Sequence, residues 1–315
     1  EERTYASVPY YSHVPNAEDM NATEYVNIRT AKMEDKPVVI VNMGNAQKQG
    51  FMVCRKCGGA QVFDGSEPRV SQPYHSAGHL CTSHIYENVF LGYEFRTDMF
   101  LIEACYDRSK MSRNSILIKS AVETLLEALR RAITLVLDID YNEINCGYIS
   151  RRDENNTNKI YLELFFYDNL SSGAGYSSQI GDILPQILAK AYESLDCTCD
   201  KSCRHCLDNF WNQRKHQYFD RELGLQLLDW IVKEQVPSNY NEEKQKALLL
   251  PLVKLLETGE VPVIEKDGKY WVNGRAMVAI PSLLNHPFDT NDKLYFSVHE
   301  LRECLSDSFI RACKK

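Results

Sequence analysis

Cys197-Thr-Cys199-Asp-Lys-Ser-Cys203-Arg-His-Cys206 is the stretch that decides the fold, because it places four of the chain's eleven cysteines within ten residues. Thiolates are soft anionic ligands, and four of them complete the tetrahedral shell of a structural zinc ion. Four cysteines can also hold an iron–sulfur cluster, or can meet by chance as buried or disulfide-bonded residues. The spacing favours zinc. A site with four protein ligands stabilises a fold and leaves no open position for an activated water.

A second pair, Cys54 and Cys57, has CxxC spacing and is followed by two glycines, as in the tight turn of a zinc knuckle. The partners that we expect are Cys81 with His79 or His75, because Cys-Cys-His-Cys is a common structural set. The alternative is a surface CxxC beside unrelated loop histidines. The pattern therefore predicts a second zinc ion in a zinc-ribbon-like element.

Composition places the chain among soluble globular proteins: it has 315 residues, of which 44% are hydrophobic and 25% charged. No apolar run is long enough to span a membrane. Clustered cysteines without a secretory signal favour metal thiolates in the reducing cytoplasm. The formal net charge of −7 is unusual for a free-standing nucleic-acid binder, so any DNA contact is expected to be a local patch or to come through a partner.

Hydrophobic spacing predicts both helices and strands. The clearest helix covers residues 114–137, where apolar side chains recur at helical spacing. Further helices are expected at 178–195, 220–233, 242–257 and 298–312. Strands are expected at 37–41, 50–53, 93–102 and 159–167, with a hairpin turn at Asp267-Gly268. The predicted fold is α/β (mixed α+β), with a zinc-ribbon-like element, a four-cysteine zinc knot and a helical C-terminal extension.

Four regions are expected along the chain. They are an N-terminal arm (1–35), a zinc-ribbon and β region (36–110), a zinc-binding α/β domain (111–236) and a C-terminal extension (237–315). The boundary near residue 236 rests on the linker signal Pro237-Ser-Asn.

Two further patterns could carry catalysis. The loop Ser171-Ser-Gly-Ala-Gly-Tyr176 lies between a predicted strand and helix, where a phosphate could bind, but a tight turn is the preferred interpretation. No GxxxxGK[ST] motif is present in these 315 residues, so the chain by itself is not expected to hydrolyse ATP.

Glu163 and Asp168 could hold a metal ion as in a nuclease, which is an alternative function.

Basic residues after the second cysteine of the cluster form the candidate DNA contacts. They are Lys201, Arg204, Arg214, Lys215 and Arg221. Residues 212–221 also contain His216 and Asp220, which could take part in proton transfer. The preferred interpretations are a hydrogen-bonded brace beside the metal or a contact with DNA phosphates.

Several motifs together resemble a known family. They are Phe95-Arg-Thr-Asp98, the segment Tyr167–Tyr176, the C-x-C-x3-C-x2-C cluster, Leu207-Asp-Asn-Phe-Trp-Asn-Gln-Arg-Lys-His216 and Asp220-Arg221. Over roughly residues 50–235 the chain resembles the MrfA-type zinc-binding domain. This domain, long of unknown function, occurs in bacterial superfamily-two DNA helicases and in helicase-associated subunits of DISARM-like or Druantia-like anti-phage systems.

The resemblance implies that residues 111–236 form a helicase-associated domain whose four cysteines, Cys197 to Cys206, bind zinc. It implies a non-catalytic module that supports DNA binding and motor architecture in bacterial anti-phage defence. Its partners would be DNA and a superfamily-two motor, on the same polypeptide or in a separate subunit. The alternatives are the C-terminal part of an MrfA-like DNA-repair helicase, the metal-dependent nuclease, and a scaffold that never meets DNA.

Overall fold

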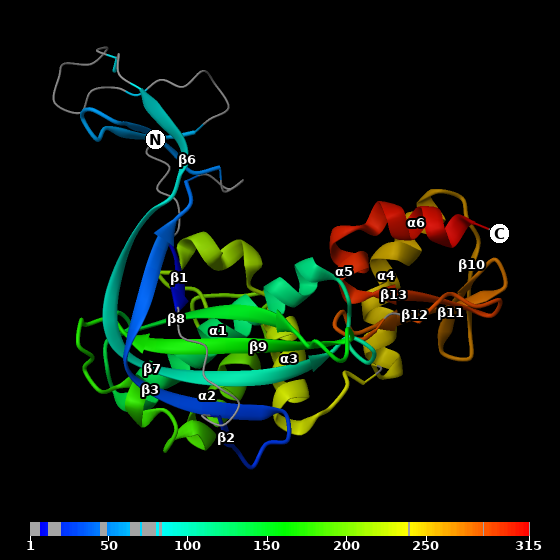
Figure 1. The fold of residues 1–315 in the computed structure, drawn as a ribbon. Coiled ribbons are helices and arrows are strands. Elements are labelled where there is room, and N and C mark those ends of the chain that lie inside the picture. The colour runs from blue at the N-terminus through cyan, green and yellow to red at the C-terminus, as the bar shows by residue number, and fades with distance from the viewer. Residues whose placement is uncertain are drawn as a thin grey trace.

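The computed structural model describes residues 7–11, 20–44, 49–63, 70, 80–81, 84–238, 240–285 and 287–314. The described residues form a main unit of one large sheet and three α-helices, a small arm sheet, and a C-terminal unit (Figure 1). The predicted mixed α+β class is confirmed.

The main sheet is antiparallel throughout its described pairings. Its strands follow the order β1-β3-β7-β9-β8, and β2 pairs with the beginning of β3. Their bounds are β1 Ser7–Tyr11, β2 Asn21–Ala22, β3 Ile28–Asn42, β7 Leu91–Asp107, β8 Ile144–Arg152 and β9 Lys159–Asp168. The expected boundaries at residues 35 and 110 do not separate this sheet. β3 runs across residue 35, and β7, which lies before residue 110, pairs with β9, which lies after it.

Two long strands carry the arm sheet. β3 and β7 pair from Ile28–Ala104 at one end to Asn42–Leu91 at the other. The arm sheet lies beyond that far end, as Figure 1 shows, and its order is β5-β4-β6. Its strands are β4 Phe51–Cys54, β5 Ala60–Val62 and β6 Ile85–Val89. The expected ribbon region is therefore an insertion between two strands of the main sheet.

Three helices cover one face of the main sheet: α1 Ser115–Leu137, α2 Leu184–Leu195 and α3 Arg221–Lys233 (Figure 1). Twelve residues of α1 are buried, more than one apolar stripe provides, because α1 packs against α2 and α3 as well as the sheet. The Asn114 side chain caps its first turn by accepting a hydrogen bond from the Ile116 amide at 2.9 Å. The helix predicted at 178–195 instead begins at Leu184, after the 3₁₀ turn η2 Ser177–Gln179.

The opposite face of the main sheet has a smaller core. Its buried side chains come from three strands and are Ala31, Met33, Val38, Met99, Leu101, Phe165 and Tyr167. The sheet curls so that β1 approaches β8, although the two are at opposite ends of the strand order. A Cβ atom on Gly147 of β8 would lie 2.7 Å from Cγ of Pro9, so this close approach requires glycine.

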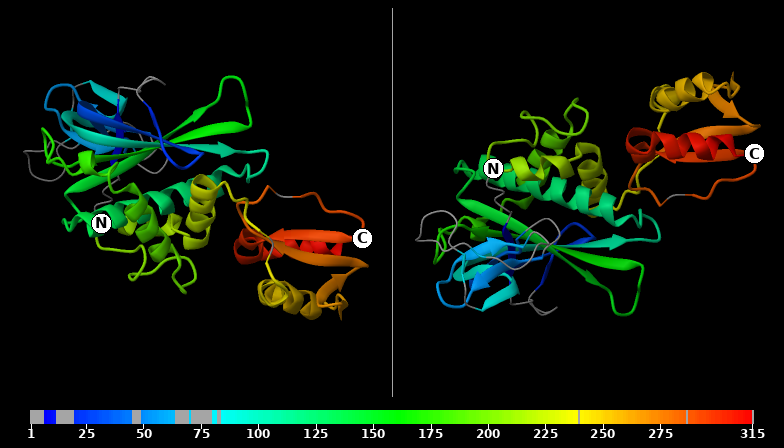
Figure 2. Two further views of the ribbon diagram at one scale, coloured as in Figure 1. Left: turned by 90° about the horizontal axis from the view of Figure 1, so that it is seen from below. Right: turned by 90° about the horizontal axis from the view of Figure 1, so that it is seen from above.

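The C-terminal unit has its own core and a four-stranded sheet of order β10-β11-β12-β13 (Figure 2). Its elements are α4 Glu242–Thr258, β10 Val263–Lys266, β11 Lys269–Val272, β12 Arg275–Ile280, β13 Lys293–Ser297, α5 Val298–Glu303 and α6 Leu305–Cys313. The predicted turn at Asp267-Gly268 joins β10 and β11, with φ of 52° and 72°. The single helix expected at 298–312 is two helices, separated at Cys304. No described helix of the chain is long and apolar enough to cross a membrane.

One loop joins the two larger units. β12 and β13 are parallel neighbours, so the chain crosses between them through residues 281–292. Leu283 of this loop is fully buried in the core of the main unit. The Leu283 amide donates a hydrogen bond to Oε1 of Gln226 in α3 at 3.0 Å, and the Leu283 carbonyl accepts one from the Ser112 amide at 2.7 Å.

Candidate metal centres and the adjoining surface

The four-cysteine cluster (Cys197, Cys199, Cys203 and Cys206) brings four sulfur atoms together. All four lie within 4.8 Å of one another. The Sγ–Sγ distances are 3.8 Å for 197–203, 3.7 Å for 199–206 and 3.6 Å for 203–206. Zn–S bonds of about 2.3 Å in a tetrahedron require sulfur atoms about 3.8 Å apart. The arrangement therefore fits a zinc ion with no further ligand.

Packing and backbone hydrogen bonds hold this cluster in place. It follows the end of α2 at Leu195, and Cys206 is 1% exposed in the main core. The amides of Cys206 and Leu207 both donate to the Cys203 carbonyl, at 3.1 and 3.0 Å, which closes the knuckle turn. Arg221 at the start of α3 fixes the other side, because its Nε donates to the Cys199 carbonyl at 2.5 Å.

Backbone amides lower the cost of a thiolate at Cys203. The amide of His205, with that of Cys206, brings the pKa of Cys203 down to about 7. Burial raises the pKa of Cys199 and of Cys206. Thiolates without a cation are therefore unfavourable at these two positions, and a bound zinc ion would supply the positive charge that compensates them.

The three-cysteine cluster (Cys54, Cys57 and Cys81) lies in the arm sheet region. Its three sulfur atoms are within 4.8 Å of one another, and Sγ of Cys57 is 3.3 Å from Sγ of Cys81. Gly58 has a φ of 69°, and its amide donates to the Cys54 carbonyl at 2.9 Å, as the predicted knuckle turn requires. His75 and His79, the predicted fourth ligands, lie outside the described residues.

The same electrostatic contrast occurs in the three-cysteine cluster. The amides of Cys57 and Lys56 lower the pKa of Cys54 to about 7. The neighbouring Cys57 thiol, together with burial, raises the pKa of Cys81 to about 12. In each cluster, backbone amides of the turn lower the pKa of one thiol, that of Cys54 or Cys203. Other thiols in the two clusters have raised pKa values, so their thiolates need a cation.

The segment after the four-cysteine cluster is anchored along one face of α1. Asn209 Nδ2 donates to the buried Glu127 at 3.3 Å, and Lys215 forms an ion pair with Glu123 at 3.0 Å. The Asp220 amide donates to Oγ1 of Thr124 at 2.9 Å. The turn also closes on itself, because His216 Nε2 lies 2.7 Å from Oδ1 of Asn212. These contacts match the brace that was preferred over a proton-transfer site.

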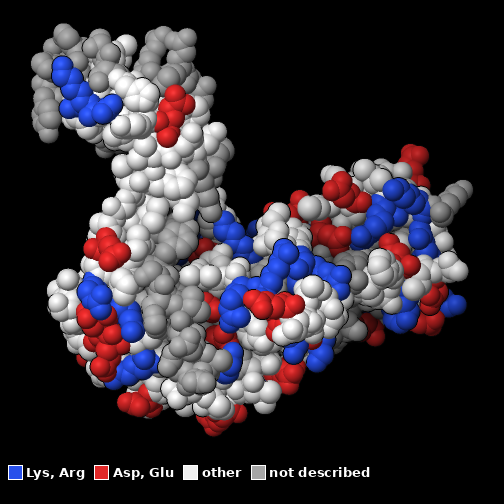
Figure 3. All heavy atoms as spheres, in the orientation of Figure 1, with Lys and Arg blue, Asp and Glu red and all other residues white. Residues whose placement is uncertain are grey.

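The predicted DNA contacts differ in their surroundings. Lys201 pairs with Glu303, Lys215 with Glu123, and Arg221 with the Cys199 carbonyl. Burial opposes the charge on Lys215, but Glu123, Cys146 and Glu127 together outweigh it and raise the pKa of Lys215. Arg204 and Arg214 are exposed. On the face drawn in Figure 3, Lys and Arg are interspersed with Asp and Glu, so this face has no extended basic surface.

The glycine loop after β9 holds an internal carboxylate. Asp168 is fully buried, and its Oδ2 accepts hydrogen bonds from the amides of Ala174 and Gly175 at 2.6 Å each and of Tyr176 at 3.2 Å. Its Oδ1 accepts from Ser177 at 2.8 Å. The amides that could have cradled a phosphate therefore surround a carboxylate of the chain itself. The tight-turn interpretation is correct.

The two carboxylates of the nuclease alternative, Glu163 and Asp168, are already bound by other groups of the protein. Glu163 is paired with Arg151 at 3.0 Å, and Arg151 also contacts Glu103 at 2.8 Å. Glu163 and Asp168 are five positions apart in β9, so they point to opposite faces of the sheet. They cannot share a metal ion in this fold.

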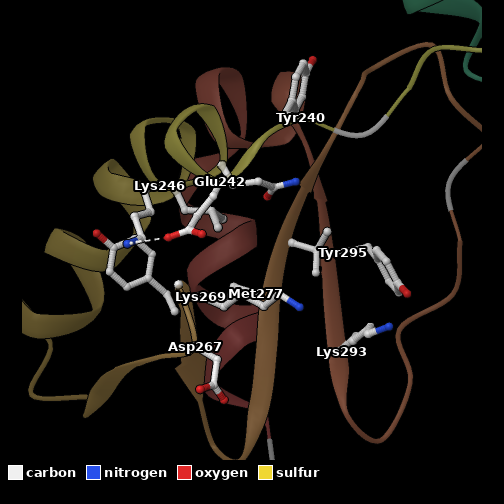
Figure 4. A pocket seen from close by; sticks show the side chains of 13 residues that line it. Tyr240, Glu242, Lys246, Asp267, Lys269, Met277, Lys293 and Tyr295 are labelled. Carbon is white, nitrogen blue, oxygen red and sulfur yellow. Dashed lines mark ion pairs between the residues drawn. The ribbon is translucent and has the colours of Figure 1, made fainter.

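Sequence reasoning did not single out two surface features. Phe210 and Trp211 are 74% and 63% exposed, directly after the four-cysteine cluster. The other feature is a hollow of about 330 Å³ between α4 and the strands of the C-terminal unit (Figure 4). Its charges are of both signs: Lys246 pairs with Glu242 at 3.2 Å, and Asp267, Lys269 and Lys293 also line it. It contains no set of metal ligands among the described residues.

Residues 125–207, which include the four-cysteine cluster, match the family model of the MrfA Zn-binding domain. This match makes residues 125–207 a domain of the MrfA Zn-binding type, and the cysteine cluster inside it has the geometry of a zinc site. The resemblance inferred from the sequence motifs is confirmed.

Among known relatives, the chain is 31% identical over 319 residues to the Druantia protein DruE of Escherichia coli (strain UMEA 4076-1). The match covers 91% of this chain and 17% of that protein, so the chain spans about a sixth of its relative's length.

Two crystal structures of the DUF1998 helicase MrfA also resemble the chain. The one bound to DNA has a TM-score of 0.41 at 12% identity and covers 72% of this chain and 25% of that chain. The one bound to DNA and AMPPNP has a TM-score of 0.30 at 15% identity, with 66% and 23% covered.

Proposed function

We propose that this chain is the non-catalytic zinc-binding module of a bacterial superfamily-two helicase or translocase assembly that acts in cytoplasmic anti-phage defence. The observation that carries the proposal is the 31% identity to a Druantia protein across 91% of the chain. The motor lies on the same polypeptide or on a separate subunit, and ATP hydrolysis belongs to it. The module braces the motor and helps to hold DNA.

Zinc is the structural cofactor of the module. Cys197, Cys199, Cys203 and Cys206 hold one ion, and their sulfur separations support this assignment. Cys54, Cys57 and Cys81 hold a second ion, with His79 or His75 as the fourth ligand. Zinc supplies a fixed positive charge that joins segments of the chain, and no ligand position remains for catalysis at the four-cysteine site.

DNA contact falls to the basic residues that face solvent. Arg204 is the best candidate, because it is exposed beside the four-cysteine cluster, and exposed Arg214 is the second. Lys201, Lys215 and Arg221 were also predicted, but their internal partners give them structural roles. Arg204→Glu should therefore weaken duplex binding and flatten its salt dependence by about 0.9 in the log–log slope. An unchanged slope would favour the scaffold alternative.

A plaque assay tests the defence role. Cells that carry the complete system with Cys203→Ser should lose protection against phage, while Cys313→Ser, outside both clusters, should keep it. The assembly purified through this chain should hydrolyse ATP when DNA is added, and the chain alone should hydrolyse neither ATP nor DNA. Full protection with the Cys203 variant, or ATPase activity in the isolated chain, would contradict the proposal.

The match of residues 125–207 to the MrfA Zn-binding domain favours one second candidate, the C-terminal part of a DNA-repair helicase. The same strains separate the two functions. A repair role predicts that Cys203→Ser makes cells sensitive to DNA-damaging agents and leaves phage plating unchanged.

A further inference from the structure

The turn that contains Phe210 and Trp211 is built to keep both rings in solvent. Oδ1 of Asn209 accepts hydrogen bonds from the amides of Trp211 and Asn212 at 2.8 and 3.1 Å. Nδ2 of Asn212 donates to the Leu207 carbonyl at 2.8 Å, and Asn209 is anchored to Glu127 of α1. The turn therefore has little freedom to fold the rings back onto the protein.

The two rings are neighbours as well as exposed. Their centroids are 5.3 Å apart and their planes are at 85°, so each ring presents a face in a different direction. Adjacent exposed aromatic rings on a rigid turn mark a binding surface more often than isolated ones, because exposing them to water is unfavourable.

A hollow of about 800 Å³ adjoins Phe210. Arg204, Asp208, Asn209, Phe210, Gln213 and His216 line it. Oδ1 of Asp208 is buried and has no hydrogen-bond partner among the described residues. Because the Asp208 carboxylate also lines the hollow, it can accept a hydrogen bond from a ligand there. Arg204 at the rim supplies a positive charge.

We propose that the Phe210–Trp211 turn and the hollow beside it bind unpaired bases of single-stranded DNA. The inference rests on the proposed association with DNA and names the strand form that this surface recognises. A base stacks on Phe210 in the hollow, where the Asp208 carboxylate accepts a hydrogen bond from an N–H group of the base, such as N3–H of thymine. The next base stacks on Trp211, and Arg204 faces the backbone phosphate.

Single strands fit these features better than duplex DNA does. In a duplex the faces of the bases are covered by their neighbours, so a protruding ring finds no face to stack on. Aromatic platforms with a nearby cation are the usual means of holding unpaired bases, and they tolerate sequence variation. A helicase exposes such bases while it separates strands, next to the module that accompanies it.

The test uses the zinc-loaded chain at low ionic strength, with an oligothymidylate that is fluorescently labelled for anisotropy and a duplex of equal length. Replacing both rings by alanine should weaken oligothymidylate binding at least tenfold, as expected for lost base stacking. The salt dependence of binding should not change, because no phosphate contact is removed. Phe288→Ala removes a ring that is 93% exposed in the C-terminal unit and should have no effect.

Tryptophan fluorescence gives an independent readout. Trp211 is 63% exposed, Trp230 is only 2% exposed, and Trp271 is half-buried in β11 of the C-terminal unit, so an unlabelled single strand should quench mainly Trp211. Trp211→Phe should abolish most of the quenching yet keep most of the affinity, since a stacking ring remains. Zinc content and melting temperature should match wild type in each variant, because both side chains are exposed.

Different outcomes separate this inference from the proposed function. Wild-type affinity for the single strand in the double alanine variant would overturn the base-binding inference. If Arg204→Glu nevertheless flattens the salt dependence of duplex binding, the proposed association with DNA remains supported. If the double alanine variant loses motor binding but keeps its affinity for the single strand, the turn is a protein-docking surface, and the base-binding inference is overturned. If neither the chain nor its motor assembly binds DNA, both proposals fail.

Discussion

The two cysteine clusters offer similar thiolate chemistry in different surroundings. The four-cysteine cluster packs into the main core and joins the end of α2 to the start of α3. Among the described residues, the three-cysteine cluster shares a core with only a few side chains, including Met52 and Val70, beyond the far end of β3 and β7. The same metal chemistry should therefore govern global folding in one place and only local order in the other.

The magnitudes sharpen this contrast. A structural zinc ion contributes on the order of 10 kcal/mol of apparent binding free energy, and a typical domain is stable by only about 5–15 kcal/mol. Loss of the metal from a site within the main core can remove most of the free energy of unfolding. Loss from a peripheral site can be absorbed by local opening.

The largest effect is expected for Cys203→Ser. The variant should lose one zinc per chain and the cooperative thermal transition of the main unit, because the three remaining thiols, among them buried Cys206, are left without their cation. Metal analysis and circular dichroism during heating measure the two results. Cys313→Ser is the control. A zinc-free protein that melts at the wild-type temperature would break the comparison.

Asp168→Asn should give the next largest effect. The amide can accept hydrogen bonds only through its single oxygen, so at least one of the four backbone donors loses its partner and the others lose a charged acceptor, at a cost of about 3 kcal/mol. The free energy of unfolding, measured by urea titration, should fall while the zinc content stays at the wild-type value. If Asp168→Asn also lowers the zinc content, the stability of the main core and metal binding at the four-cysteine cluster depend on each other, contrary to this prediction.

A smaller effect is expected for Arg302→Ala. Arg302 of α5 contacts Asp200 between the second and third cysteines at 3.3 Å, and Glu222 of α3 at 3.8 Å. Ion pairs of this exposure contribute about 0.5–1 kcal/mol. Urea titration should show a loss of that size, reduced further at high salt. A loss of several kcal/mol would show that α5 is an essential support of the four-cysteine cluster.

The smallest effect on the main unit is expected for Cys57→Ser. The second zinc should be lost and amide exchange should quicken in β4, β5 and β6, because few buried contacts remain to hold the arm sheet. The melting temperature of the main unit should stay within a few degrees of wild type. Global unfolding of this variant would mean that the two clusters belong to one cooperative unit.

Local signals carried most of the successful predictions. The helix at 114–137, the turn at Asp267-Gly268 and the cysteine spacing each depend on residues close together in the chain. The pairing of β3 with β7 joins residues between 49 and 76 positions apart, and no short pattern encodes it. The role of Asp168 was missed for a related reason, since a carboxylate before a glycine loop looks alike whether it faces solvent or its own amides.

Charge and aromatic character were harder to place than secondary structure. Lys215 and Arg221 looked like surface cations. Lys215 instead pairs with Glu123, which is distant in the sequence, and Arg221 donates to the carbonyl of Cys199, which lies in the turn of the four-cysteine cluster. Phe210 and Trp211 follow a buried Leu207, and an aromatic pair in that setting ordinarily belongs to a core. The asparagines on either side, which favour turns, were the available signal of exposure.

The seating of Leu283 in the main unit has a consequence for the order of folding. β12 and β13 are parallel, so their pairing must wait until residues 281–292 have closed a loop. That loop is held by Gln226 and Ser112, whose positions exist only after α3 and the start of α1 have packed. Synthesis from the N-terminus presents this surface first. β13 emerges after the main unit and thus completes its sheet on a template that the earlier part of the same chain has already formed.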